Sequence, residues 1–326
     1  MAGVNYEEII QVFKKEGVVA VPIFSGDEVA RIREELHASL EIDHAAALGG
    51  DAATLERLGG ARMKSKAANL FADDWKFRVV ADDRVLAVAG ALMAATFGPG
   101  DLPGYEHPLG RGDDIRLYLD RCQYRLPDHV RGEGGLGLHL DRNPKDPYFL
   151  HSDGKNKTTK HASGLLKFRP IQSFISLTDQ YGSESGGLRV VRGFHKEIDD
   201  YFARSSEDLG SAKGGEFFRM DSKIHASLWK RAAPVDAPAG SIVFWDNRLA
   251  HATCEKLTSH DSREVLYTAY VPSNDLNRKY IQMQLENLRR GLAPPAYNST
   301  SKEPCHCGID FGALTMRQKE VLGLLD

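Results

Sequence analysis

The sequence predicts a mainly β protein with flanking α-helices, in which short strands form a closed or double-sheet core. Two observations predict this class. Between residues 114 and 272, seven runs rich in β-branched and aromatic residues alternate with turns of uneven length. Helical periodicity is found before and after this region, and no internal repeat is visible.

The first forty residues predict a helix, a strand and a second helix. The segment Tyr6–Lys15 carries apolar residues at helical spacing and ends before Gly17. The next run, "VVAVPIF", is rich in β-branched residues and predicts a strand. Ser25 suits the N-cap of the following helix. Residues 43–100 are rich in Ala and Leu and predict mostly helix and loop, within a variable insert over residues 43–112.

The core strands come next and are followed by helix. The predicted strands are "IRLYLDRCQYRL", "GLGLHL", "IQSFISLTD", "GLRVVRG", "GEFFRM", "GSIVFWD" and "REVLYTAYVP". After Pro272, "NDLNRKYIQMQLENLRRG" and "LTMRQKEVLGLL" predict two helices. We find no linker and expect one domain over residues 1–326, made of N-terminal elements (1–112), a β core (113–272) and a C-terminal helical extension (273–326).

Composition and charge disfavour several classes of protein. The net charge is −3 and the Lys and Arg residues are scattered, which is unlike a nucleic-acid-binding protein. The N-terminus lacks the features of a secretory signal, and no apolar run approaches the roughly 20 residues that span a bilayer. Four cysteines in a chain of this length do not form a disulfide framework. We expect a cytoplasmic protein without nucleic-acid or membrane partners.

The pattern His-x-Asp occurs twice in "HLDRNPKDPYFLHSDG", at His139/Asp141 and at His151/Asp153. His139 ends a run with alternating leucines, so the first pair shares one face of a predicted strand and can grip a metal ion. His151 instead opens a polar stretch typical of a solvated loop. With twelve histidines in the chain, one pair can arise by chance, so the pattern alone is weak. We favour the first pair as the metal site.

Two further residues complete a candidate site. His251 follows the predicted strand "GSIVFWD" and could join His139 and Asp141 in the His₂–carboxylate triad of non-haem Fe(II) oxygenases. Arg263 begins the next strand and offers a fork of donors that matches a carboxylate. Taken singly, His251 could be an ordinary histidine at a barrel rim, and Arg263 could form a surface salt bridge with Glu264 or Asp261. Their combination is what indicates a site.

These motifs resemble those of the Fe(II)/2-oxoglutarate-dependent oxygenases of the phytanoyl-CoA hydroxylase type. "FKKEGVVAVPIFSGDEVARIREEL" is similar to the opening of that family, and "HLD" to its iron-binding pair. "IQSFISLTDQYGSESGGLRVVRGFHK" and "GSIVFWDNRLAHAT" resemble its signature segments, the second of which delivers the second iron histidine. The closing "LTMRQKEVLGLL" is also of a kind seen in relatives. The resemblance implies a double-stranded β-helix (jelly-roll, cupin-like) core with iron held by His139, Asp141 and His251.

The resemblance also implies contacts with the co-substrate. Arg263 would bind the distal carboxylate of 2-oxoglutarate, assisted by the hydroxyl of Thr253. Phe174 occupies a position where the family places an aromatic ring beside the co-substrate. Gln172 shares its strand face, and Arg121 aligns, less securely, with a position nearby. Iron and O₂ would then oxidise a C–H bond of a small organic substrate, with release of succinate and CO₂.

The substrate is not implied, because residues 43–112 and the Gly-rich segment 129–137 depart from the family pattern. Hydroxylation is the default reaction, with desaturation or oxidative cyclisation as variants, whereas Asp141 disfavours halogenation because related halogenases lack this carboxylate. The alternatives are a cupin-like metalloenzyme that does not use 2-oxoglutarate and a catalytically silent small-molecule-binding relative.

Two more clusters leave alternatives open. By strand alternation, Arg121, Gln123 and Arg125 share a face, which would suit an anionic substrate if that face is inward. These arginines could equally lie at the barrel rim or pair with Asp120 and Asp128. The tripeptide Cys305-His306-Cys307 predicts a solvated loop, because three adjacent residues cannot span a tetrahedral zinc site. Tyr118 and Trp245 could line the pocket, although a place in the core is the simpler expectation.

Overall fold

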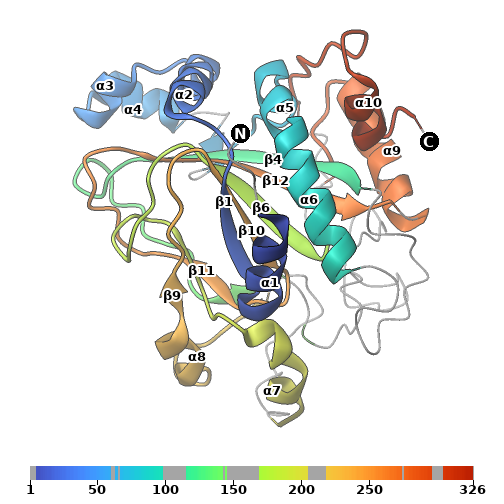
Figure 1. Ribbon diagram of the computed structural model, residues 1–326. Coiled ribbons are helices and arrows are strands. Elements are labelled where there is room, and N and C mark those ends of the chain that lie inside the picture. The colour runs from blue at the N-terminus through green and yellow to red at the C-terminus, as the bar shows by residue number, and fades with distance from the viewer. Residues whose placement is uncertain are drawn as a thin grey trace.

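The computed structural model describes residues 5–59, 63–64, 67–97, 115–141, 144, 169–204, 218–273, 275–295 and 304–325. At its centre lie two antiparallel sheets (Figure 1). Over these residues the larger sheet has the strand order β1-β10-β6-β12-β4-β3-β2. Its strands are β1 (Val18–Pro22), β10 (Ser241–Asp246), β6 (Ile171–Ser176), β12 (Arg263–Pro272), β4 (Ile115–Arg125), β3 (Ala67–Ala68) and β2 (Met63–Lys64).

The smaller sheet has the order β8-β5-β11-β7-β9. Its strands are short: β8 (Phe218–Arg219), β5 (His139–Leu140), β11 (His251–Thr253), β7 (Leu188–Val190) and β9 (Ala233–Pro234). One buried cluster joins residues of this sheet, such as Val190, to Phe174, Val243 and Trp245 of the larger sheet. The smaller sheet therefore packs against one face of the larger sheet, which we call the inner face.

Helices cover the opposite, outer face of the larger sheet (Figure 1). They are α1 (Tyr6–Glu16), α2 (Gly26–Leu40), α3 (His44–Leu48), α4 (Ala52–Leu58), α5 (Asp74–Val80), α6 (Asp83–Thr96) and α10 (Met316–Leu322). A further helix, α9 (Asp275–Arg289), lies along β4: its Leu285 and Leu288 join the outer cluster, whereas Tyr280 and Ile281 pack with Tyr118 of β4. Leu36, Phe77 and Leu92 from these helices share a buried cluster with Ile175 and Phe244 of the strands. Burial of this apolar surface is the main term that holds the helices to the sheet.

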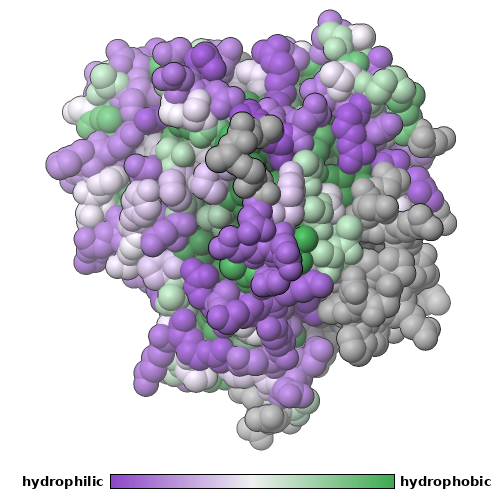
Figure 2. Space-filling model, in the orientation of Figure 1, coloured by the Kyte–Doolittle hydropathy of each residue, from purple (hydrophilic) through white to green (hydrophobic). Residues whose placement is uncertain are grey.

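Two more helices, α7 (Ile198–Arg204) and α8 (Ala226–Arg231), lie beside the smaller sheet, and a 3₁₀ turn (Phe194–Lys196) precedes α7. Phe202 of α7 and Leu228 of α8 are buried in the same cluster as that sheet. The face in Figure 2 is mostly hydrophilic, with smaller hydrophobic areas. Among the described residues, no helix has the length and apolar character required to cross a bilayer.

A β-bulge in β4 sets which of its side chains face inward. Leu266 pairs with Cys122 but Thr268 pairs with Leu119, so two residues of β4 lie opposite the single Tyr267. Leu117 and Leu119 pack in the outer cluster on one side of the bulge, and Cys122 and Tyr124 do so on the other. The inner face of β4 therefore carries Tyr118 before the bulge and Gln123 and Arg125 after it.

The predicted opening of helix, strand and helix is confirmed by α1, β1 and α2, and the two C-terminal helices by α9 and α10. Ser25 caps α2 through a reciprocal pair of hydrogen bonds with Glu28. The strand expected in "GLGLHL" is wrong in its extent, because the paired residues are His139–Leu140 alone and Leu136 is 44% exposed. A mainly β core with flanking helices is confirmed as two antiparallel sheets, and the double-stranded β-helix stays a prediction.

We expect Gly240→Ala to lower the free energy of unfolding by about 2–3 kcal/mol. Gly240 has φ +86°, and a Cβ atom at this position would collide with the carbonyl oxygen of Phe24. That oxygen belongs to the segment whose amides at Ile23 and Phe24 donate to the Gly240 carbonyl, each at 3.0 Å. Urea denaturation followed by circular dichroism measures the change.

Gly26→Ala is the matched control, because nothing lies within 4 Å of a Cβ atom at Gly26. It should change the free energy of unfolding by less than about 0.5 kcal/mol. Equal losses in the two variants would contradict the steric account of Gly240.

Candidate metal centre

Two strands of the smaller sheet bring the predicted triad together. His139 on β5 and His251 on β11 lie directly opposite each other in the antiparallel register. Asp141 follows β5 at the position that shares the side of His139. Nε2 of His139 lies 3.4 Å from Oδ1 of Asp141, and Nε2 of His251 lies 3.6 Å from Oδ2. The ligand atoms of the three residues all lie within 4.8 Å of one another.

The hydrogen bonds of the two histidines fix which nitrogen faces the cluster. Nδ1 of His139 lies 2.8 Å from the Gly137 carbonyl, and Nδ1 of His251 lies 3.0 Å from the Leu249 carbonyl. A carbonyl only accepts, so both Nδ1 atoms carry the proton and donate. In the neutral rings, the Nε2 lone pairs then face the carboxylate of Asp141. Lone pairs facing a carboxylate repel it unless a cation or extra protons lie between them.

The electrostatics of the cluster favour the cation. Burial lowers the pKa of His251, and the neighbouring His139 lowers it further, which outweighs the opposite effect of Asp141. Burial raises the pKa of Asp141, but hydrogen bonds from both histidines, which need a proton on each Nε2, outweigh burial and hold that pKa well below its ordinary value, so the carboxylate requires positive charge between it and the rings. The cluster thus offers two imidazoles and one carboxylate, with the Nδ1 bonds to carbonyls that orient metal-ligating histidines. This donor set fits a divalent transition-metal ion.

Aromatic rings connect the triad to the inner face of the larger sheet. The ring of Trp245 on β10 lies 5.7 Å from that of His251, between centroids. Phe174 on β6 lies 5.8 Å from Trp245, and its ring lies 5.6 Å from the guanidinium carbon of Arg263 on β12. Phe174 and Trp245 therefore form a continuous apolar path from the candidate metal ligands to Arg263.

Arg263 is a buried cation with neutral partners. It is 2% exposed, and its guanidinium donates to Oε1 of Gln180 at 3.0 Å and to Oε1 of Gln123. In the described part of the chain, it forms no ion pair with a carboxylate. The alternative that Arg263 pairs with Asp261 or Glu264 is wrong, because Arg33 binds both of those carboxylates. A buried cation without a countercharge is costly, so this position favours an anionic ligand.

Arg125, opposite Arg263 in the register, is neutralised instead. Its guanidinium donates to Asp128 at 2.9 Å and to the carbonyls of Cys254 and Glu255. The expected alternative of a pair with Asp128 is therefore confirmed. Gly186 lies over both arginines: it has φ +64°, and a Cβ atom there would meet Arg125 Nη1 at 3.0 Å and Arg263 Cδ at 3.4 Å.

The other residues predicted to contact the co-substrate, Gln172, Thr253 and Arg121, have partners other than Arg263. Gln172 shares the inner face of β6 with Phe174 and donates to Oδ1 of Asn247 at 2.6 Å. Oγ1 of Thr253 accepts from the Leu136 amide at 2.5 Å, which leaves its proton for another acceptor. Arg121 lies at the bulge, with its guanidinium 5.6 Å from the ring of Phe71. No direct bond joins Thr253, Gln172 or Arg121 to Arg263.

Some expectations concern other regions. His151 and Asp153, the rejected pair, lie outside the described residues. Cys305 is buried rather than solvated, which corrects the expectation for that residue, and burial raises the pKa of its thiol to about 11. Sequence reasoning missed Gln180 as a partner of Arg263, because nothing in "SLTDQYG" distinguishes this amide from a surface residue.

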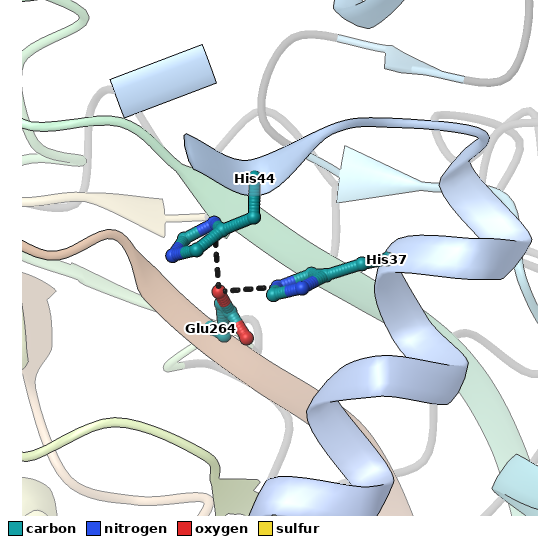
Figure 3. Close-up of side chains that lie close together, drawn as sticks. All are labelled: His37, His44 and Glu264. Atoms are coloured by element: carbon teal, nitrogen blue, oxygen red, sulfur yellow. Dashed lines mark hydrogen bonds and ion pairs between the residues drawn. The ribbon is translucent and has the colours of Figure 1, made fainter. Parts of the chain in front are cut away.

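A second cluster of His37, His44 and Glu264 also brings three possible metal ligands together (Figure 3). Its geometry does not suit an ion. The two imidazoles stack with centroids 4.3 Å apart and planes 13° from parallel, so in-plane lone pairs from both rings do not converge on one point. Arg33 also bonds both carboxylate oxygens of Glu264. Within the described residues, the His139 cluster is therefore the better metal site.

The class of protein is thus one with two packed antiparallel sheets, in which the smaller sheet carries a possible metal site of two histidines and one carboxylate. A family model described as Gig2-like matches residues 155–310, just under half of the chain. No curated protein matches the chain. The phytanoyl-CoA hydroxylase resemblance stays a prediction.

Two solved structures share this fold. GIG2 (DUF1479), the product of a GlcNAc-inducible gene of Candida albicans, is similar with a TM-score of 0.74 at 17% identity, over 98% of this chain and 76% of that one. A protein of Salmonella typhimurium LT2, named for a proposed oxidoreductase activity, is similar with a TM-score of 0.72 at 16% identity, over 95% of this chain and 81% of that one. At such identities, the likeness shows the fold.

We expect the protein to bind one Fe(II) ion per chain, and His251→Ala to weaken this binding by more than about 100-fold, because it removes a direct ligand. Anaerobic dialysis followed by metal analysis measures the stoichiometry. His37→Ala, in the second cluster, is the matched control and should keep one ion per chain. Loss of the ion in the His37 variant, with retention in the His251 variant, would move the metal centre to the second cluster.

Proposed function

We propose that the protein is an Fe(II)- and 2-oxoglutarate-dependent oxygenase that oxidises a C–H bond of a small organic metabolite. One observation supports this proposal above the others: two aromatic rings connect the His139–Asp141–His251 cluster to a buried arginine that has no countercharge among the described residues. We also infer that the two sheets form the double-stranded β-helix of such oxygenases, in the phytanoyl-CoA hydroxylase type.

The three protein ligands would hold iron on one face and leave the remaining coordination positions open. When bound, iron with 2-oxoglutarate and O₂ supplies the oxidising chemistry, with release of succinate and CO₂. Asp141 occupies the position that a halide would need, which favours hydroxylation, desaturation or oxidative cyclisation over halogenation. Hydroxylation is the default reaction.

The residues of the chain would bind and orient the co-substrate. The guanidinium fork of Arg263 suits the distal carboxylate of 2-oxoglutarate, which would replace or join the amide oxygens of Gln123 and Gln180. Phe174 would form the wall along the carbon chain, and Thr253 would offer its hydroxyl proton. The buried surroundings exclude water, which strengthens the ion pair. Gln172 would face the ligands from the inner face of the larger sheet, whereas Arg121 packs its guanidinium against Phe71 at the bulge.

One observation favours a second candidate, a cupin-like metalloenzyme that does not use 2-oxoglutarate. The guanidinium of Arg263 already has two amide acceptors, so its hydrogen-bonding capacity is partly satisfied without a ligand. On this alternative, Arg263 would stabilise the sheet interface, and the metal centre would bind its substrate directly. The two candidates differ in whether a 2-oxo acid with a distal carboxylate chelates the bound metal.

We expect the anaerobic Fe(II) protein to develop a weak visible charge-transfer band when 2-oxoglutarate is added. Arg263→Gln should raise the 2-oxoglutarate concentration for half-saturation by about 100-fold or more, because a charge-assisted bidentate contact contributes roughly 3 kcal/mol. Iron binding should not change. Absorption titration measures both constants.

Arg189→Gln is the matched control, because the guanidinium of Arg189 donates to the backbone carbonyls of Trp229 and Ala232 away from the triad. It should leave the 2-oxoglutarate titration unchanged. Iron binding without any band in the wild-type protein would overturn the proposal in favour of the second candidate.

A further inference from the structure

We propose that a polar network around the buried Glu264, on the outer face of the larger sheet, positions Arg263 for the distal carboxylate of 2-oxoglutarate. We call this network the α2–α3 clamp. Its residues are Arg33, His37, His44, Tyr124, Asp261 and Glu264. The inference rests on the proposed function, because it assigns a role to residues behind the co-substrate site.

Glu264 connects the clamp to Arg263. The two residues are neighbours on β12, so their side chains leave the strand on opposite faces. Glu264 is 0% exposed, and Arg33 binds it in a fork, with Nε 3.0 Å from Oε2 and Nη2 3.0 Å from Oε1. Nε2 of His37 lies 2.9 Å from Oε1 (Figure 3). Ser262 donates to the same oxygen at 2.6 Å.

The clamp also contacts the strand next to β12. Tyr124 on β4 lies between Gln123 and Arg125, and its hydroxyl is 2.8 Å from Nδ1 of His44. Burial raises the pKa of Tyr124, so this hydroxyl keeps its proton and can donate to Nδ1. Nε2 of His44 then donates to Asp261 at 3.1 Å, and Arg33 bonds the same oxygen at 2.9 Å.

Backbone contacts hold the same end of β12. The amide of Glu264 donates to the Thr178 hydroxyl at 3.2 Å, and its carbonyl accepts from the Leu177 amide at 2.9 Å. The clamp therefore holds β12 at Glu264 and β4 at Tyr124 from the outer face. The neighbouring residues of these two strands, Arg263 and Gln123, contact each other on the inner face. A shift of the Glu264 backbone would move the Arg263 Cα with it.

The clamp depends on charge. Burial raises the pKa of Glu264, but hydrogen bonds from His37 and Arg33 outweigh burial and lower it. The same balance, with His44 and Arg33 as donors, lowers the pKa of Asp261. Both carboxylates are therefore ionised, and the buried Glu264 depends on the guanidinium fork of Arg33, which also donates one bond to Asp261. Lysine at position 33 would keep the charge but lose the planar fork, so Arg33→Lys tests the geometry rather than the charge.

Arg33, Tyr124 and Glu264 are thus positioning residues that act through Arg263. A ligand without a distal carboxylate provides the discriminating probe. Pyruvate can chelate the metal through its carboxylate and keto oxygens, but it is too short to engage Arg263. A residue that positions Arg263 affects 2-oxoglutarate binding and leaves pyruvate binding alone, whereas a residue that only stabilises the fold affects both.

We expect Arg33→Lys and Tyr124→Phe each to raise the 2-oxoglutarate concentration for half-saturation by about tenfold, as is typical when a residue that supports a binding group is altered. Pyruvate and Fe(II) binding should change by less than about twofold, since neither contacts Arg263. Anaerobic absorption titration of the Fe(II) protein measures all three. Tyr124→Phe removes one oxygen atom and serves as the milder variant if Arg33→Lys does not fold.

Arg84→Lys is the matched control. Arg84 also forks onto a carboxylate of α2, Glu28, and onto Asp82, but no β12 residue takes part in that network. The control should bind 2-oxoglutarate as the wild type does. Wild-type affinity in both clamp variants, or equal weakening of 2-oxoglutarate and pyruvate, would overturn the positioning role. No 2-oxoglutarate complex in the wild type would instead overturn the proposed function, and this inference with it.

Discussion

The start of β12 carries the arrangement on which the rest of the site depends: a buried arginine on the inner face and a buried glutamate on the outer face. Because side chains alternate along a strand, Arg263 and Glu264 lie on opposite faces of the sheet, and their partners belong to different layers of the fold. Glu264 finds a complete set in Arg33, His37 and Ser262. In the part of the chain that the structure describes, Arg263 contacts neutral amides and no carboxylate, which leaves its charge uncompensated. The anion requirement is thus built into one strand.

The smaller sheet imposes a complementary requirement. Its two histidines each donate from Nδ1 to a carbonyl two residues earlier in the chain, so both Nε2 atoms converge on Asp141. The smaller sheet therefore provides electron-pair donors that favour a bound metal ion. The larger sheet provides the positive charge of Arg263, which favours a bound anion. A metal ion chelated by a 2-oxo acid with a distal carboxylate satisfies both layers at once, which is why the proposed chemistry follows from the pair and not from either alone.

Strand parity made the cluster of His139 and Asp141 predictable, and the strand-end position made His251 predictable. The bulge in β4 and the partners of Arg263 were not, because they depend on register between segments far apart in sequence. The same limit explains why Asp261 and Glu264 looked like local partners of Arg263: their true partner, Arg33, lies more than 200 residues earlier. The short length of β5 was not predictable either, because alternating leucines do not show whether a partner strand is present.

The most direct measurement of the central claim is a crystal structure of the anaerobic complex with Fe(II) and 2-oxoglutarate. The account predicts one ion within roughly 2.0–2.3 Å of Nε2 of His139, Nε2 of His251 and a carboxylate oxygen of Asp141. It also predicts the distal carboxylate of 2-oxoglutarate on the guanidinium of Arg263, beside Phe174. An ion held elsewhere, or 2-oxoglutarate bound without contact to Arg263, would contradict the account.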